Sequence, residues 1–132
     1  MASSAANQET YGLTHLAILV SDVDRTLQFY KAVFHAEVMY QEKTWAQVRT
    51  PGSNDIIVFE QSDNNHVGKT AGILHFGFRL RDPRHITALV DRVKRAGGVV
   101  REQGEFVPGS PYVFFKDPDG YEIEIWYEKL PS

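Results

Sequence analysis

The chain repeats a short pattern, and each copy carries a histidine at the same place. The copies read LTHLAILVSD from Leu13 and ILHFGFRLRD from Ile73, and each is a strand-like run that ends in an aspartate before a helical pattern. His15 and His75 both stand third in their copies. A fold built from two such units would bring the two imidazoles together across a pseudo-twofold axis. Because histidine is the commonest protein ligand of metals, the repeat indicates a metal site.

Both copies predict the same order of elements, namely a strand, a helix and three more strands. In the first unit the strands are expected at 11–20, 38–41, 45–50 and 56–60, and the helix carries an apolar stripe of Leu27, Tyr30, Val33 and Phe34. In the second unit they are expected from 73 onward and at 99–102, 112–116 and 121–127. Asp82 is a suitable N-cap for the second helix, with Pro83 at the first helical position.

These elements predict an α+β fold in which two βαβββ units form one cup-shaped mixed sheet. We expect a disordered tail over residues 1–10 and a single domain over 11–132, made of units 11–61 and 73–128 and a polar linker, 62–72. A chain of 132 residues is the right length for one such domain.

The composition narrows the range of functions. The net charge is −3 and no long basic stretch is present, so nucleic acid is not an expected partner. The chain has no cysteine, so any metal must be held by histidine and carboxylate. Because no secretory signal and no run of about 20 apolar residues is visible, we expect a cytoplasmic protein without a membrane partner.

Four segments resemble the vicinal oxygen chelate superfamily, which includes glyoxalase I, fosfomycin resistance enzymes, extradiol dioxygenases and bleomycin-binding proteins. They are the opening around His15, the helix at 27–34, the opening around His75 and the closing DPDGYEIEI at 117–125. The resemblance covers about 11–127 and implies the glyoxalase/bleomycin resistance/dioxygenase-like fold. In that family a divalent metal lies at the base of the cup, bound by the opening and last strands of each unit.

Carried over to this chain, the family's metal-binding positions are His15, His75, Glu124 and a fourth position, which an ungapped repeat alignment assigns to Ile57. Isoleucine cannot bind a metal, so two histidines and one carboxylate remain. This set suits iron, manganese, zinc, nickel or cobalt as divalent ions. The alternative is that both histidines are ordinary core residues and that Glu124 is solvated. Glu122, on the same strand face, is the rival carboxylate.

Strand alternation extends the expected site to a substrate-binding lining. If Glu124 points into the cup, then Trp126 does too, as does Phe59 by the repeat. The neighbouring strands add the other lining candidates, which are Trp45, Arg49, Tyr112 and Phe114, with Lys116 as a further cation. The alternative is core packing for the aromatic residues and a solvated edge for the cations. Phe114 stands where dioxygenases and fosfomycin transferases of the family carry a tyrosine.

The resemblance implies a divalent-metal-dependent enzyme that acts on a small oxygen-chelating substrate. Lyase, isomerase, transferase and ring-cleaving dioxygenase activities all remain open, and no catalytic residue is assigned. The alternative is a metal-free protein that binds or sequesters a small molecule, as bleomycin resistance proteins do; a purely structural role ranks third. The family also implies a homodimer in which His15 comes from one chain and His75 with Glu124 from the other.

Overall fold

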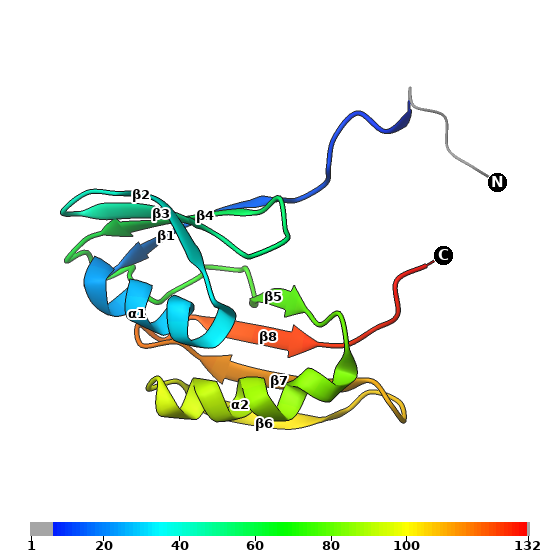
Figure 1. Cartoon of the computed structure of the whole chain (residues 1–132). Coiled ribbons are helices and arrows are strands. Elements are labelled where there is room, and N and C mark those ends of the chain that lie inside the picture. The colour runs from blue at the N-terminus through cyan, green and yellow to red at the C-terminus, as the bar shows by residue number, and fades with distance from the viewer. Residues whose placement is uncertain (1–6, 132) are drawn as a thin grey trace.

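A computed structural model describes residues 7–131 as two four-stranded sheets packed around two α-helices (Figure 1). The first sheet has the order β1-β4-β3-β2, and the second has the order β5-β8-β7-β6. The first unit consists of β1 (His15–Val20), α1 (Val23–Phe34), β2 (Glu37–Gln41), β3 (Trp45–Arg49) and β4 (Ile56–Gln61). The second consists of β5 (Phe76–Arg79), the 3₁₀ turn η2 (Pro83–His85), α2 (Ile86–Arg95), β6 (Val99–Glu105), β7 (Pro111–Lys116) and β8 (Glu122–Trp126). The predicted α+β class and the two βαβββ units are thereby confirmed.

The two units share one strand arrangement. In each, the opening strand runs parallel to the last strand, β1 beside β4 and β5 beside β8, whereas the other neighbours are antiparallel. Each sheet also has an irregularity in the second strand of its unit, between Val38 and Tyr40 in β2 and between Val100 and Glu102 in β6. The opening strands are shorter than expected, so His15 begins β1 and His75 directly precedes β5.

Aspartate side chains cap both helical segments, and the cap at Asp82 is the predicted one. Asp22 Oδ1 accepts a hydrogen bond from the backbone nitrogen of Arg25 at 3.2 Å, and Asp82 Oδ1 accepts one from that of Arg84 at 2.9 Å. Such caps satisfy donors that have no partner inside the helix. Pro83 opens the 3₁₀ turn that leads into α2, where its missing N–H costs no hydrogen bond.

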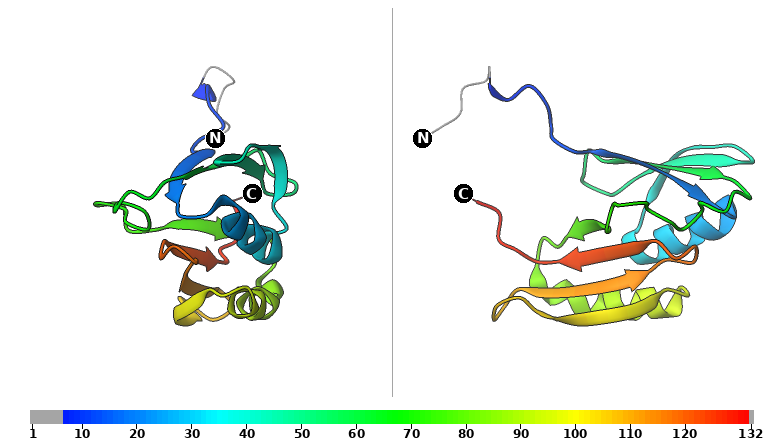
Figure 2. Two further views of the ribbon diagram at one scale, coloured as in Figure 1. Left: turned by 90° about the vertical axis from the view of Figure 1, so that its left-hand side faces the viewer. Right: turned by 180° about the vertical axis from the view of Figure 1, so that it is seen from behind.

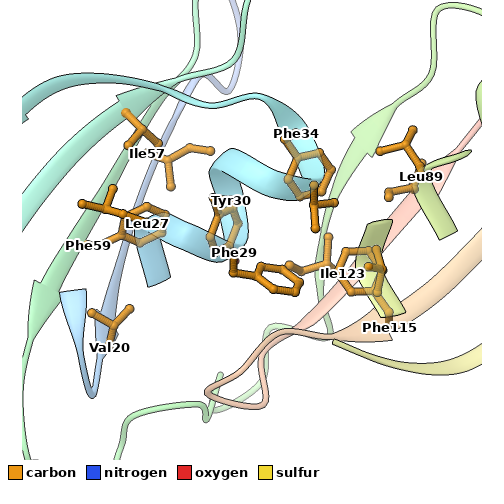
Figure 3. Close-up of a cluster of buried hydrophobic side chains, with 14 of the residues drawn as sticks. Val20, Leu27, Phe29, Tyr30, Phe34, Ile57, Phe59, Leu89, Phe115 and Ile123 are labelled. Atoms are coloured by element: carbon orange, nitrogen blue, oxygen red, sulfur yellow. The ribbon is translucent and has the colours of Figure 1, made fainter. Parts of the chain in front are cut away.

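A single hydrophobic core joins the two units. Helix α1 lies between the two sheets, and α2 covers β6 and β7 (Figures 1 and 2). Figure 3 shows Phe29 and Tyr30 of α1 between side chains from both sheets. The ring of Tyr30 lies 4.8 Å from that of Phe59 in the first sheet, and the ring of Phe29 lies 6.2 Å from that of Phe115 in the second. Each sheet therefore turns one face to the core and leaves the other, its open face, outside.

The N-terminal segment before β1 contributes little to the hydrophobic core. Residues 1–6 of the expected N-terminal tail lie outside the described part of the chain, and residues 8–14 lead into β1 with no regular structure. Tyr11 and Leu13 in that segment are almost fully exposed. Among residues 7–131, no helix is both long and apolar enough to cross a membrane.

Candidate metal centre

His75 and Glu124 lie side by side on the open face of the second sheet. Strand β8 alternates strictly, because Ile123 and Ile125 are fully buried while Glu124 between them faces outward. β5 pairs with β8 in parallel, with Gly77 opposite Glu124, so the residue just before β5 reaches the same place. His75 Nε2 is 3.2 Å from Glu124 Oε1, with side chains 30% and 15% exposed respectively. The structure thus brings together the two expected ligands of the second unit.

His15 lies elsewhere. It begins β1 on the first sheet, is exposed, and belongs to the open face because Ile18 and Val20 of the same strand pack into the core. Among residues 7–131, no three histidine, aspartate or glutamate side chains are grouped so that they could hold a metal ion. Within the described part of one chain the two imidazoles are therefore not brought together, and a site shared between two chains stays a prediction. Their strands belong to different sheets, whose open faces both point away from the shared core.

The rival carboxylate, Glu122, already has a cationic partner. Arg101 Nε donates a hydrogen bond to Glu122 Oε1, and this contact raises the pKa of the guanidinium. The same guanidinium lies 5.0 Å from the centroid of the Phe114 ring, a cation–π arrangement. Within residues 7–131 the one ion-pair partner of Glu124 is His75, so Glu124 rather than Glu122 is the carboxylate without a cationic arginine or lysine partner. Sequence reasoning missed Arg101, because its position depends on the irregularity in β6.

Aromatic side chains surround the His75–Glu124 pair. Phe114 of β7 is the cross-strand neighbour of Glu124, and its ring lies edge-on to the His75 ring at 5.1 Å. Tyr112 is opposite Trp126 in the same pair of strands, and its ring stacks on Phe106 at 4.2 Å. Beside Glu124 is a cavity of about 390 Å³, to which Trp126 and the 106–110 connection contribute. The open face of the second sheet thus holds three of the expected lining residues: Tyr112, Phe114 and Trp126.

The first sheet holds two further lining candidates on its own open face. Trp45 and Arg49 alternate along β3 with Ala46 and Val48, which are fully buried. Arg49 Nε is 3.4 Å from a carboxylate oxygen of Glu37 on the neighbouring strand. Two of the expected lining residues are therefore found on a different sheet from the His75–Glu124 pair.

Phe59 and Ile57 face the core, which corrects the alignment of the repeat. Phe59 is fully buried and Ile57 is 5% exposed. Ile57 pairs with buried Val48 as Ile123 pairs with buried Phe115, so Ile57 corresponds to Ile123. The true counterpart of Glu124 is Val58. The reason is that residues 50–55 between β3 and β4 make a connection one residue longer than residues 117–121 between β7 and β8.

The sequence and the fold both match one superfamily. The sequence model of the Glyoxalase/Bleomycin resistance protein/Dioxygenase superfamily matches residues 12–125. A probable lactoylglutathione lyase of Vibrio parahaemolyticus is 33% identical over 130 residues, which cover 91% of this chain and 93% of that protein. A lactoylglutathione lyase of Arabidopsis thaliana is 30% identical over 84% of this chain, which spans only 42% of the longer relative.

Solved structures share the fold at lower sequence identity. The fosfomycin resistance protein FosX from Mesorhizobium loti superimposes with a TM-score of 0.74 at 19% identity, covering 92% of this chain and 95% of that one. FosX from Listeria monocytogenes, solved with Mn(II) and a sulfate ion, gives a TM-score of 0.75 at 21% identity, covering 92% and 93%. The chain therefore belongs to the glyoxalase/bleomycin resistance protein/dioxygenase superfamily, also called the vicinal oxygen chelate superfamily.

Proposed function

We propose that the protein is a divalent-metal-dependent enzyme whose metal site forms between two copies of the chain. His75 and Glu124 of one copy and His15 of the other would hold the ion. The observation that carries the proposal is the 3.2 Å separation of His75 Nε2 and Glu124 Oε1 on an open sheet face. The lactoylglutathione lyase relatives and the Mn(II) in a FosX structure support the metal dependence.

The chemistry of the pair fits a divalent ion. An imidazole nitrogen and a carboxylate oxygen are the donors that such ions take in the absence of cysteine. Within residues 7–131 neither side chain has another hydrogen-bond or ion-pair partner, so both remain available as ligands. When bound, a divalent ion polarises the oxygen atoms of a small substrate and stabilises negative charge that develops on them. Val58 at the fourth position offers no donor, so we expect three protein ligands.

The surroundings indicate the class of substrate. The site favours a substrate with an apolar or planar portion, because concave sites bind their ligands chiefly through apolar contact. The rings that provide this contact are those of Phe106, Tyr112, Phe114 and Trp126. Arg101 beside Phe114 is already paired with Glu122, and Arg49 on the other sheet is paired with Glu37, but each guanidinium keeps further N–H donors for an acidic group. A small molecule with adjacent oxygen atoms and an acidic group suits this lining. Lactoylglutathione has both features. It is the first candidate, because the relatives are lactoylglutathione lyases.

Metal analysis of protein purified without chelator tests the proposal. We expect stoichiometric metal in the wild type and its loss in His75→Ala and Glu124→Ala, with the fold retained. Glu122→Gln is the matched control, because it changes a carboxylate on the same strand face that is already paired with Arg101. Full metal content in His75→Ala would contradict the assignment, as would loss of metal in Glu122→Gln alone.

A metal-free small-molecule binding protein is the second candidate. It is favoured by the cavity beside Glu124 and by the lack of a complete three-ligand group within the described part of one chain. In that case the purified protein would carry no stoichiometric metal. A small aromatic ligand would then bind equally well before and after treatment with chelator.

A further inference from the structure

We propose that the groove between the two units is a second ligand site, which binds a small anion with an apolar body. This cavity of about 410 Å³ lies among the end of α1, the β3–β4 connection, β5 and α2. It includes neither His75 nor Glu124. Its wall contains Ile125, which faces the core, whereas Glu124 beside it on β8 faces the opposite side of the sheet. The groove is therefore separate from the candidate metal centre.

The polar wall of the groove is strongly cationic. Arg79, Arg81 and Arg92 line it together with His35 and His85. The single acidic residue in the lining is Asp55, and its Oδ1 accepts a 2.8 Å hydrogen bond from the backbone nitrogen of Thr50. Arg79 directs its guanidinium to the backbone oxygens of Glu128 and Lys129, so Arg81 and Arg92 are the cations that matter here. Two guanidinium groups and the one carboxylate of Asp55 leave an excess of positive charge in the groove. Such an arrangement attracts an anionic group.

Two of these guanidinium groups have spare donors and no carboxylate partner. Arg81 Nη2 donates to the carbonyl oxygen of Gly52 at 3.0 Å, and Arg92 donates through Nε and Nη2 to that of Val33 at 3.2 and 3.0 Å. Within residues 7–131 no carboxylate oxygen lies within 4.0 Å of either side chain. A guanidinium has five N–H donors, so each can still bind a carboxylate or phosphate group. Their carbonyl contacts hold both groups in place across the junction of the two units.

Most of the remaining lining of the groove is apolar, with Thr50 and Ser53 as the polar exceptions. The rings of Phe34 and Phe78 stack with centroids 3.7 Å apart, one from each unit, and Leu89 of α2 lies beside them in the lining. Figure 3 shows Phe34 of α1 and Leu89 of α2 at this junction. A ligand that matches both surfaces has an anionic head for the arginines and an aromatic or aliphatic body for these side chains. Aryl carboxylates and aryl phosphates share that chemistry.

The site is tested by titrating the full-length protein with phenyl phosphate and with benzoate. Binding is measured by calorimetry and by changes in NMR chemical shifts. Inorganic phosphate and benzyl alcohol, each lacking one half of the ligand, are the comparison probes. We expect at least one aryl anion to bind more tightly than either half alone, and the tighter of the two identifies the preferred head group. Arg81→Gln should weaken binding about tenfold through loss of a charge-assisted contact.

Matched variants separate binding from a purely structural role of the arginines. Arg84→Gln is the control, because Arg84 is exposed, outside the groove and already paired with Asp82 at 2.6 Å. It should leave the dissociation constant unchanged. Glu124→Ala should also leave it unchanged, so the result does not depend on the metal centre. Arg92→Gln should weaken binding as Arg81→Gln does, with folding verified by circular dichroism.

Several results would overturn the proposal. They are the absence of saturable binding of either aryl anion, equal binding of the wild type and Arg81→Gln, and loss of binding in Glu124→Ala. The last result would place the ligand at the metal centre. Lower thermal stability of Arg81→Gln with unchanged binding would show that Arg81 only ties the two units together.

Discussion

The hydroxyl of Tyr30 in α1 donates a 2.8 Å hydrogen bond to Oδ2 of Asp117, which ties the helix of the first unit to the last turn of the second. Both residues are buried. Asp117 Oδ1 accepts backbone hydrogen bonds from Asp119 and Tyr121, both at 3.0 Å, so the carboxylate also shapes its own turn. Burial raises the pKa of Tyr30 well above its usual value, and the charge of Asp117 raises it further. Burial likewise raises the pKa of Asp117, although the hydrogen bond from Tyr30 opposes that rise.

Removal of the Tyr30 hydroxyl should therefore destabilise the protein. Tyr30→Phe leaves Asp117 Oδ2 buried without its partner, at a cost of about 1–3 kcal/mol. The comparison is Tyr112→Phe, which removes a 2.6 Å hydrogen bond to Glu102 at an exposed position. Urea denaturation should show a clearly larger loss for Tyr30→Phe. Equal losses would mean that the buried contact has no special weight.

The same pair predicts a change in stability at alkaline pH. In the unfolded chain Tyr30 ionises near 10.0, whereas in the folded protein it keeps its proton to higher pH. The folded state then binds more protons than the unfolded state, so unfolding becomes easier as pH rises above about 10. Tyr30→Phe lacks this group. The difference in unfolding free energy between wild type and variant should thus stay constant from neutral pH to about 10 and shrink at higher pH, as measured by denaturation at a series of pH values.

A subunit-mixing experiment tests the shared metal centre. His15→Ala and Glu124→Ala should each lack metal as separate proteins. After subunit exchange, a heterodimer would contain one intact site and one doubly altered site, by the twofold geometry of such a dimer. Metal content should recover to about one ion per heterodimer. Verified exchange without recovery would show that the ligands do not come from two chains.

The corrected repeat alignment predicts different effects of a carboxylate at two neighbouring positions. Val58→Glu places it on the open face, where it corresponds to Glu124, and should tighten metal binding in calorimetric titration. Ile57→Glu places it in the core, where Ile57 is 5% exposed, and should strongly destabilise the fold because a buried charge has no partner there. Tighter metal binding by Ile57→Glu in a stable protein would restore the original alignment.

Gly77 is predicted to set the position of Trp126. A Cβ atom at residue 77 would lie 2.8 Å from the indole ring, so Gly77→Ala must displace that ring. Trp126 lines the cavity beside Glu124, and the change should therefore alter both ligand binding and Trp126 fluorescence. A Trp45→Phe background isolates the signal, because the chain has two tryptophans. An unchanged emission spectrum would show that the ring does not rest on Gly77.

Local patterns in the sequence determined the units and the family. Capping by Asp22 and Asp82 depends on contacts within a few residues, and the cap predicted at Asp82 forms as expected. Alternation along β8 has a period of two residues, so the outward position of Glu124 between Ile123 and Ile125 followed from the strand alone. The resemblance to the superfamily rested on four such local segments, and the superfamily's sequence model, which matches residues 12–125, confirms it.

Tertiary structure alone decided the register and the separation of the ligands. One extra residue in the 50–55 connection turns Ile57 and Phe59 toward the core, since a shift of one residue exchanges the two faces of a strand. The irregularity in β6 brings Arg101 to Glu122. His15 is apart from His75 because the sheets pack their inner faces around α1. That arrangement depends on contacts between residues far apart in the chain, which no local pattern contains.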